Sequence, residues 1–342
     1  MRPLLPPATA AADDPLFELL LARAAAHSRP RRRTDPHVVS LVVEGGGMRG
    51  AVCAGMCLVL EAAGLMSSVD RVYGCSSGAL SGCFAAAGQA SLWATSFEDC
   101  ACRAFIDPSR ALLGRPVLDL DFLFDEVIAR RRPLSETGLA VGPEFRAVAV
   151  SASRAELRVL RDFESAADVL AAARASCSIP VLTGAPPTYR GEPTVDGGLL
   201  EAIPYPTALR EGATHVLVLR SRDASYRAPR PGRLAERTVA RAHPELVSLL
   251  RSCSERYNHD AAELERGPQR LPGLALVRQI SVPPGSRLVP RFSIDRGRII
   301  DSVRLGAYTM VSALYGAHAT RFWQPFPDLL PGEAALTPRL AA

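Results

Sequence analysis

Short apolar runs separated by glycine-rich turns mark the first half of the chain. The β-branched run Val38–Val43 predicts a strand, the segment Gly45–Gly50 follows it, and the apolar stretch Ala51–Ala63 predicts a helix. The same order recurs with a second short strand, Arg71–Gly74, and a helix of small residues, Ala79–Gly88. The pattern therefore predicts two consecutive strand–turn–helix units.

Strand and helix patterns keep alternating in the second half, where no internal repeat is found. The predicted strands are Pro143–Ser151, its hairpin partner Leu157–Phe163, a strand ending at Thr194–Val195, and His215–Leu219; the predicted helices are Ser165–Ser176, Pro244–Arg266 and Ser302–His318. Strands that alternate with helices predict an α/β fold with three layers, in which helices cover both faces of a mainly parallel central sheet.

The two ends of the chain differ in composition from the middle. Residues 1–36 are rich in Pro and Ala and predict a partly disordered arm with one short helix, Pro15–His27, before the basic run Arg29–Arg33. Such a run either contacts anionic lipid headgroups or forms a solvated linker, and we favour the linker. We expect one catalytic domain over residues 37–324 and an irregular, Pro-rich tail over 325–342.

Composition narrows the class of protein. With 48% hydrophobic residues in 342, the chain can bury a full core. All forty cations are Arg, but the net charge of +5 and the lack of a basic stripe interleaved with aromatics argue against nucleic acid. The eight Cys form no CxxC pair and no zinc-like cluster with His, so we expect free thiols, no metal and a cytoplasmic location. The uncharged segment 72–97 is too polar to span a membrane, and no signal peptide is recognised at the start, so we expect a soluble protein.

The first motif that carries chemistry is Glu44-Gly45-Gly46-Gly47-Met48-Arg49-Gly50 between a strand and a helix. It fits G-x-G-x-x-G, which in a dinucleotide fold needs an acidic residue at the end of the second strand. Here Asp70 precedes that strand. The other use of such a loop is to hold an anion with backbone N–H groups at a helix N-terminus, and that anion can equally be an oxyanion. The loop alone leaves both interpretations open.

The second motif is Gly74-Cys75-Ser76-Ser77-Gly78, which fits G-x-S-x-G between an apolar strand and a helix. In this setting the two glycines permit a sharp turn that presents the serine hydroxyl at the sheet edge. The centre of the pattern makes Ser76 the candidate nucleophile, whereas Ser77 falls on the first helical turn, where a hydroxyl usually caps. A structural serine in a tight turn is the alternative.

The third motif is Thr194-Val195-Asp196-Gly197-Gly198. An Asp before two glycines is usually a turn former. Because Asp196 ends a predicted strand, it can also lie at the same sheet edge as Ser76.

In this order the three motifs resemble those of the patatin-like phospholipase family, whose pattern is a G-G-G-x-[KR]-G loop, then G-x-S-x-G, then D-G-[GA]. Ala175–Pro180 and Leu199–Pro204 also resemble family segments, so that the likeness covers roughly residues 38–220 and is closest to compact bacterial members. Two positions depart from the usual pattern. Glu44 stands where many relatives carry Asp, and Cys75-Ser76-Ser77 is an uncommon filling of the elbow.

The resemblance implies a lipid acyl hydrolase with a Ser–Asp dyad, in which Ser76 is the nucleophile and Asp196 the proton acceptor. It also implies that an oxyanion hole is formed by the loop residues Gly45, Gly46, Gly47, Met48, Arg49 and Gly50, and that Gly74, Gly78, Gly197 and Gly198 shape the elbow and the D-G-G turn. The substrate is then an acyl ester of a lipid, with transient contact to a membrane surface. No cofactor, metal or obligate protein partner is implied.

Three alternatives remain at this point. A Ser-His-Asp esterase needs a histidine after the acid, and the candidates are His215, His243, His259 and His318. None of them occupies a short loop after a predicted strand. The second alternative is a non-catalytic nucleotide-binding protein that uses the glycine loop. A binding-only relative is the third, but it predicts a missing nucleophile or base, and neither is missing.

Overall fold

The computed structural model describes residues 14–267, 269–271 and 275–319, and within them nine strands form one sheet. The strands are β1 (Val39–Val43), β2 (Arg71–Cys75), β3 (Glu144–Ser151), β4 (Leu157–Leu160), β5 (Thr188–Tyr189), β6 (Glu192–Asp196), β7 (His215–Leu219), β8 (Gln269–Leu271) and β9 (Ala275–Ile280). Their order is β5-β6-β3-β2-β1-β7-β9-β8, with β4 paired to β3. The five central strands β3, β2, β1, β7 and β9 run parallel, and the edge strands are antiparallel. The predicted mainly parallel sheet is confirmed.

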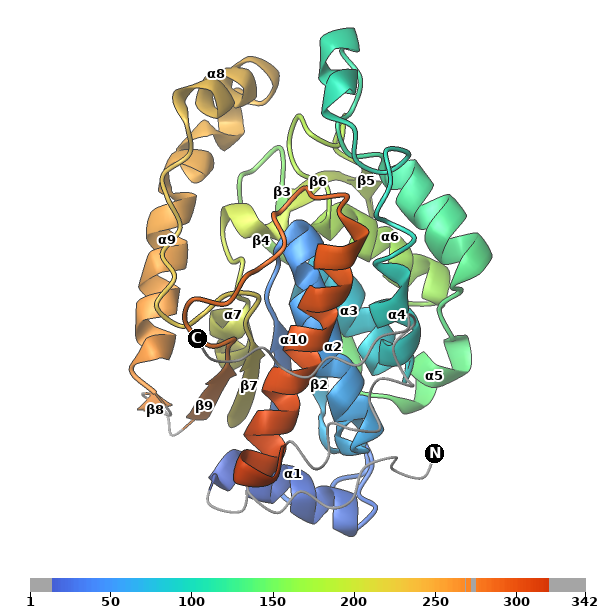
Figure 1. Ribbon diagram of the computed structural model, residues 1–342, viewed down its shortest axis with the longest axis vertical. Helices are drawn as coiled ribbons and strands as arrows, with labels where there is room; N and C mark the ends of the chain where they lie inside the picture. The colour runs from blue at the N-terminus through green and yellow to red at the C-terminus, as the bar shows by residue number, and fades with distance from the viewer. Residues whose placement is uncertain (1–13, 268, 272–274, 320–342) are drawn as a thin grey trace.

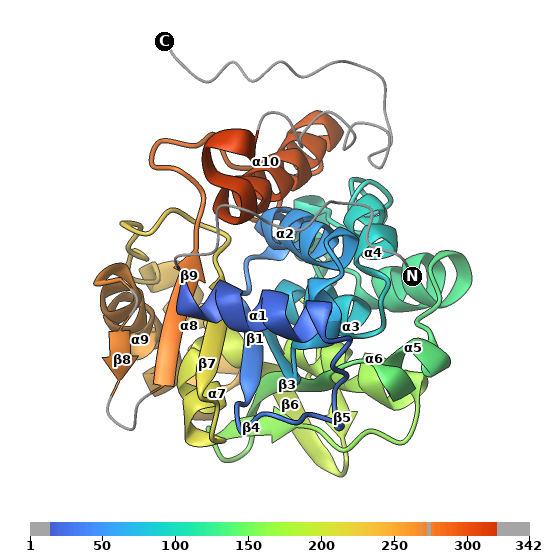
Figure 2. The same cartoon turned by 90° about the horizontal axis from the view of Figure 1, so that it is seen from below.

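The helices cover both faces of this sheet, as predicted (Figure 2). The α-helices are α1 (Pro15–Ala25), α2 (Gly50–Ala62), α3 (Ser77–Ala86), α4 (Ala90–Ser96), α5 (Glu136–Val141), α6 (Ala166–Ser176), α7 (Tyr205–Arg210), α8 (Arg233–Ala242), α9 (Val247–Glu265) and α10 (Arg296–Tyr315). The 3₁₀ segments are η2 (Gly47–Arg49), η3 (Leu65–Ser68), η4 (Pro108–Leu113), η6 (Gly197–Leu199), η7 (Pro244–Leu246) and η8 (Gly316–His318), and η5 (Phe122–Arg131) is a π-helix.

Side chains of β1 show how the two layers arise. Successive residues of a strand point to opposite faces. Leu41 and Val43 join the larger core cluster with α2, α3, α6 and α10, whereas Val42 packs with Tyr205 of α7 and Leu264 of α9 in a second cluster. All three β1 side chains are fully buried, which is why the whole strand reads as one apolar run.

Parallel register brings the carboxyl ends of the central strands to one edge of the sheet. Val43 of β1 is paired with Gly74 of β2 on one side and with Leu219 of β7 on the other. The chain continues from β1 to β2 on one side and returns later to β7 on the other side, where β7 lies next to β1 (Figure 2). The carboxyl ends of β1 and β7 therefore form a topological switch point, where open α/β sheets bind their ligands.

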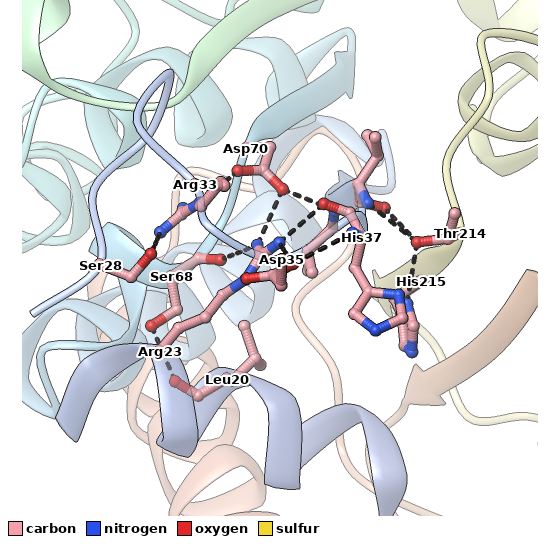
Figure 3. Close-up of polar contacts among 12 residues, drawn as sticks. Leu20, Arg23, Ser28, Arg33, Asp35, His37, Ser68, Asp70, Thr214 and His215 are labelled. Atoms are coloured by element: carbon pink, nitrogen blue, oxygen red, sulfur yellow. Dashed lines mark hydrogen bonds and ion pairs between the residues drawn. The ribbon is translucent and has the colours of Figure 1, made fainter. Parts of the chain in front are cut away.

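The opposite edge of the sheet is closed by α1 and the segment that follows it (Figure 3). Arg23 is almost completely buried and donates to Asp35 and Asp70, each within 3.0 Å. Arg33 forms an ion pair with Asp70 at 2.6 Å, and Arg31 donates to a backbone carbonyl at 3.1 Å. These two arginines are not part of a solvated linker as expected, because Asp70 and carbonyl groups of the domain hold them. The first thirteen residues of the predicted arm lie outside the described part.

Several element boundaries differ from the prediction. The predicted helix Ala79–Gly88 begins at Ser77, directly after the turn. The last helix begins at Arg296 rather than Ser302, because the Asp295 side chain caps it by accepting from an N–H of the first turn. The predicted helix Pro244–Arg266 is divided into η7 and α9.

Strand β9 was not predicted, and the predicted tail cannot be compared. Arg278 and Gln279 interrupt the apolar pattern of β9, so that no strand was recognised there. The predicted tail 325–342 and the end of the predicted domain, residues 320–324, lie outside the described residues. Within the described part, no helix is both long and apolar enough to cross a bilayer, and segment 72–97 forms buried parts of β2, α3 and α4.

Candidate active site

Ser76 occupies a sharp corner between β2 and α3. Its backbone has φ 54° and ψ −130°, a conformation that residues other than glycine rarely adopt. The flanking glycines make room: a Cβ on Gly74 would lie 2.5 Å from Cα of Ala79, and one on Gly78 would lie 2.7 Å from the carbonyl oxygen of Glu44. The predicted strand–turn–helix setting of G-x-S-x-G is confirmed, and the strained corner places the Ser76 side chain at the carboxyl edge of the sheet.

Asp196 ends β6 and is 4% exposed. Its Oδ1 accepts from the N–H of Gly198 at 2.8 Å, and Gly197 begins η6, while Cys75 Sγ lies 3.8 Å from the same oxygen. Oδ2 is buried and has no hydrogen-bond partner among the described residues. Burial raises the pKa of Asp196 above the ordinary aspartate value, and the charge of Arg291 opposes part of that shift. The site thus holds a desolvated carboxylate with one oxygen unused.

The sheet holds Ser76 and Asp196 side by side. The Ser76 N–H donates to Ser176 Oγ at 2.9 Å, and Ser176 Oγ donates at 2.6 Å to the carbonyl oxygen of Val148, on the strand next to Asp196. The Ser76 hydroxyl lies near enough to Asp196 to favour the charged carboxylate and lower its pKa, although no contact between them meets hydrogen-bond geometry. Catalytic hydrogen bonds are often longer in the free enzyme than in the substrate complex.

Gly47 has the one N–H group of the Gly45–Arg49 stretch for which no acceptor is found among the described residues. The paired N–H groups are those of Gly45 with the oxygen of Ala202 (3.1 Å), Gly46 with Ser77 Oγ (3.0 Å), Met48 with the oxygen of Arg291 (2.9 Å) and Arg49 with the oxygen of Gly46 (3.3 Å). Gly47 has φ +60°, and a Cβ there would lie 2.6 Å from the Arg291 oxygen. Only glycine fits this turn, which leaves a donor beside the site.

Ser77 contacts the glycine loop rather than the carboxylate. Its hydroxyl accepts from Gly46, and a Cβ on Gly50 would lie 2.6 Å from that hydroxyl. A Cβ on Gly45 would lie 3.1 Å from Cβ of Ser76. The loop therefore packs directly against the elbow, and Ser77 joins the two segments.

A buried ion pair supports the loop from behind. Glu44 is 1% exposed and Arg220 is fully buried, with Arg220 Nε 3.4 Å from the Glu44 carboxylate. Tyr257 of α9 donates to Glu44 at 2.5 Å, and the backbone N–H of Ser221 donates to the other carboxylate oxygen. Arg220 also donates to Tyr257 and to Gln279 of β9. Glu44 and Arg220 together thus join the ends of β1, β7 and β9 to α9.

Two cavities meet at Ser76. The narrow cavity has a volume of about 50 Å³. Its apolar lining includes Leu80, Trp93, Phe97, Phe105, Leu120 and Leu123. The wide cavity has a volume of about 680 Å³ and includes Asp196 in its wall. It is bounded by residues of α8 and α9, the two helices at the left of Figure 1. Ser76, Ile179, Arg291 and Phe292 line both cavities.

No histidine of the described residues lines either cavity. His215 begins β7 at the opposite edge of the sheet, where its ring lies 4.8 Å from that of His37 (Figure 3). Burial lowers the pKa of His215. Among the described residues, no group of three or more His, Cys, Asp or Glu side chains is placed to hold a metal ion.

The family model described as patatin-like phospholipase matches residues 41–209, which include the loop, the elbow and the D-G-G turn. The chain belongs to the patatin-like phospholipase family. This confirms the predicted resemblance, and it supports a hydrolase that acts on lipids in general terms.

Three known proteins illustrate how far the likeness extends. The uncharacterized protein YjjU of Escherichia coli (strain K12) is 27% identical over 248 residues, which cover 70% of this chain and 68% of YjjU. The solved structure of VipD from Legionella pneumophila matches with TM-score 0.37 and 13% identity over 82% of this chain and 67% of VipD. Human GIVD cytosolic phospholipase A2, solved with methyl gamma-linolenyl fluorophosphonate and terbium chloride, matches with TM-score 0.44 and 13% identity over 91% of this chain and 62% of that chain.

Several residues near the patatin-like site were missed in the sequence. Arg222 and Arg291 line the wide cavity and Tyr257 anchors Glu44, but all three lie outside the matched segment. Ser176 was noted only as part of a family-like segment. The one available signal for Arg222 is its place just after β7, since carboxyl ends of parallel strands share an edge.

Proposed function

We propose that this patatin-like chain hydrolyses acyl esters of lipids, with Ser76 as nucleophile and Asp196 as general base. The observation that carries the proposal is the buried Asp196 carboxylate, whose Oδ2 is unused and which lies in the cavity wall beside the strained Ser76 corner. A serine hydroxyl needs a base within reach, and a carboxylate with a raised pKa is a better base than an exposed one.

The reaction follows in two steps. Ser76 Oγ attacks the carbonyl carbon and its proton passes to Asp196. The tetrahedral intermediate then breaks the bond to the alcohol oxygen, which leaves with the proton from Asp196. In the second step water attacks the acyl-serine, Asp196 takes the water proton, and Ser76 recovers a proton as the fatty acid leaves.

The glycine loop is proposed as the oxyanion hole. Gly47 offers an unpaired N–H, and the Gly46 N–H can exchange its Ser77 acceptor for the oxyanion. The remaining predicted members, Gly45, Met48, Arg49 and Gly50, shape the loop through their own contacts. Removal of one oxyanion donor typically lowers the rate ~10²–10³-fold.

The two cavities assign the parts of the substrate. The narrow cavity is apolar, so we assign the start of the acyl chain to it, with the ester carbonyl at Ser76. The wide cavity then receives the alcohol portion of the ester. Contact with a lipid surface remains a prediction.

Neither the Ser-His-Asp esterase nor the nucleotide-binding protein gains support from the geometry. A Ser-His-Asp triad needs a histidine near Ser76, and among the described residues none lines either cavity. A dinucleotide fold needs an acid at the carboxyl end of the second strand, but Asp70 precedes β2 at the opposite edge, paired with Arg23 and Arg33 (Figure 3).

Labelling with a fluorophosphonate ester tests the nucleophile. The wild-type protein should take up one equivalent, and Ser76→Ala should take up none. Ser225→Ala, at an exposed serine, is the matched control and should label normally. Persistent labelling of Ser76→Ala, mapped to Ser77 or elsewhere by peptide mass spectrometry, would contradict the assignment.

A further inference from the structure

Large apolar side chains that stay exposed gather at one end of the molecule. Among the described residues six such side chains are exposed, and five of them belong to η4, to the start of α8 or to the segment before α10. The sixth is Val141 on α5. The five are Leu112, Leu113, Leu234, Phe292 and Ile294. Apolar side chains grouped in this way on a surface usually mark an interaction site.

Two of these segments project beyond the rest of the fold at the carboxyl edge of the sheet. In Figure 1, η4 is the teal projection at the top, α8 lies at the upper left, and α1 lies at the opposite end. Leu112, Leu113 and Leu234 are 89%, 74% and 80% exposed. At such exposure these three leucines contribute little to the packing of the core, so their burial requires a partner.

The bases of the two projections form walls of the cavities at Ser76. Phe105 and Leu118, on either side of η4, line the narrow cavity. Leu234 of α8 lines the wide cavity, and Phe292 lines both. The exposed leucines therefore flank the candidate active site, and a partner that covers them also faces Ser76.

Arginines accompany the exposed leucine of α8. Arg233, Arg237 and Arg241 recur at every fourth residue, so they share one side of the helix, and all three are exposed. Among the described residues none of the three makes an ion pair. Glu236, the acid of the same helix, pairs instead with Arg251 of α9. The helix thus presents positive charge without a counter-ion beside its apolar tip.

The η4 projection combines the same two features. Arg103 and Arg115 lie on either side of it, are exposed, and make no ion pair within the described part of the chain. Asp107 is the one acid between them in the sequence, and its side chain caps η4 by accepting from the N–H of Ser109 at 3.0 Å. Both projections therefore carry exposed leucines and a surplus of positive charge.

The surface of an anionic bilayer matches this combination. Apolar side chains of a peripheral protein enter the boundary between headgroups and acyl chains, and nearby arginines are attracted by anionic headgroups. A bilayer is broad and deformable, so it can bury the tips of two separate projections at once. A folded protein partner would need a matching apolar recess for each tip.

We propose that η4 and α8 form a docking surface for an anionic lipid bilayer, in which the leucines enter the bilayer and the α8 arginines contact the headgroups. Docking then turns the cavities at Ser76 towards the lipid; this consequence rests on the proposed function, whereas the docking does not require catalysis. The basic run Arg29–Arg33 is the competing surface, because it follows α1 at the opposite edge of the sheet. The docking surface consists of Leu112, Leu113, Leu234, Arg233, Arg237 and Arg241.

Binding is measured without catalysis, by sedimentation of full-length Ser76→Ala protein with phosphatidylcholine vesicles that contain or lack phosphatidylglycerol. We expect binding to the anionic vesicles that weakens as salt is added, and weaker binding to the neutral vesicles. Adding Leu112→Ser with Leu113→Ser should lower the affinity at least about tenfold, because apolar contact is lost. Adding Arg233→Gln with Arg237→Gln should lower it about fivefold for each arginine.

Two matched controls lie outside the docking surface. Val141→Ser changes the exposed apolar side chain of α5, and Arg29→Gln with Arg32→Gln removes two exposed charges near α1. Both should bind vesicles as the parent protein does. If the variant at Arg29 and Arg32 loses binding and the variant at Arg233 and Arg237 keeps it, the segment after α1 contacts the lipid and the proposal is wrong.

Fluorescence quenching tests which part of the chain enters the bilayer. Lipids brominated on their acyl chains should quench the indole of Leu113→Trp protein and leave that of Val141→Trp protein unaffected. Equal quenching of the two proteins, or none in either, would overturn the proposal. So would leucine variants that change the oligomeric state in light scattering and leave vesicle binding unchanged, because the surface then joins two copies of the chain.

Turnover separates failure of docking from failure of the proposed function. With Ser76 intact, the η4 and arginine variants should hydrolyse p-nitrophenyl butyrate in solution like the wild type, because the residues changed line neither cavity. Their hydrolysis of lipid in anionic vesicles should fall together with vesicle binding. Normal lipid hydrolysis without vesicle binding would contradict the docking surface. A wild type that hydrolyses no ester would refute the proposed function and leave the sedimentation and quenching results standing.

Discussion

Replacing Asp196 by Asn separates the proposed general base from a turn former. Asn keeps the side-chain oxygen that accepts from Gly198, so that the D-G-G turn should be preserved. It cannot accept the proton of Ser76, and loss of a general base typically lowers the rate ~10²–10⁴-fold, which corresponds to about 3–5 kcal/mol of activation free energy. We therefore expect a folded protein with kcat reduced by that factor.

Stability gives an independent readout of the same residue. Because burial raises the folded-state pKa of Asp196, the charged form is disfavoured in the folded protein, and the wild type loses stability as the pH rises from the ordinary aspartate pKa through the folded value. Asp196→Asn removes this cost. At neutral pH its melting temperature should equal or exceed that of the wild type, and the difference should narrow as the pH is lowered through the folded pKa.

The assay is ester hydrolysis across pH, with circular dichroism melting on the same samples. In the wild type kcat/KM should rise with pH as Asp196 loses its proton, at a pH above the ordinary aspartate value. Because nucleophile and base act together, Ser76→Ala with Asp196→Asn should be no worse than Ser76→Ala alone. Asp168→Asn, which changes an acid on α6 that accepts from Tyr189, is the matched control and should keep its activity. Near-normal turnover by a well-folded Asp196→Asn protein would refute the dyad.

Further predictions address the histidines, the buried ion pair and the α1 contact. Each candidate histidine changed singly to Gln should keep ester hydrolysis within about tenfold of the wild type. A loss as large as that of Ser76→Ala in any one variant would support a triad. The variants are His215→Gln, His243→Gln, His259→Gln and His318→Gln. Tyr257→Phe removes one donor to Glu44 and should lower the free energy of unfolding by about 1–3 kcal/mol, measured by urea denaturation, while unchanged stability would show that the network contributes little. Arg23→Ala removes the ion pairs of Arg23 with Asp35 and Asp70, and only Asp70 keeps another guanidinium partner, Arg33. It should lower the free energy of unfolding by about 3 kcal/mol, with an unaltered melting temperature as the contrary result. Beside Arg23 the pKa of Asp35 falls to about 2, so its contribution to stability should hold above pH 3.8 and be lost between pH 3.8 and 2 in acid unfolding monitored by circular dichroism.

The central strands and the candidate dyad could be predicted because their signals are local. Val39–Val43 is buried on both faces and reads as a β-branched run. At Gly74 and Gly78 a Cβ would clash with neighbouring backbone, so the turn at Ser76 needs glycine at both positions. A Cβ at Gly47 would also clash, so the glycine loop is recognisable as a motif in the sequence. Places where two backbone segments approach closely can therefore be recognised in the sequence from their glycines.

Other features depend on contacts between distant segments and have no local sequence motif. Arg23 is one of forty arginines, and nothing around it distinguishes a buried ion pair with Asp70 from a solvated side chain. Strand β9 carries Arg278 and Gln279, and Gln279 is explained by its hydrogen bonds with Arg220 across the sheet and with the carbonyl oxygen of Leu264 on α9. Composition and periodicity cannot supply these pairings, because each requires two segments far apart in the sequence to pack together.

The strand order gives a physical reason why two arginines lie in the wall of the wide cavity. At the switch point between β1 and β7 the chain continues from the two strand ends in opposite directions along the sheet, and ligands bind in the crevice at such points in open α/β sheets. The loop after β1 brings Arg49 to this crevice, and the residues after β7 bring Arg222. Ser76 follows β2, the neighbour of β1, so the nucleophile stands beside the crevice rather than in it. If Ser76 is the nucleophile as proposed, the part of the substrate that extends across the end of β1 lies beside the guanidinium groups of Arg49 and Arg222.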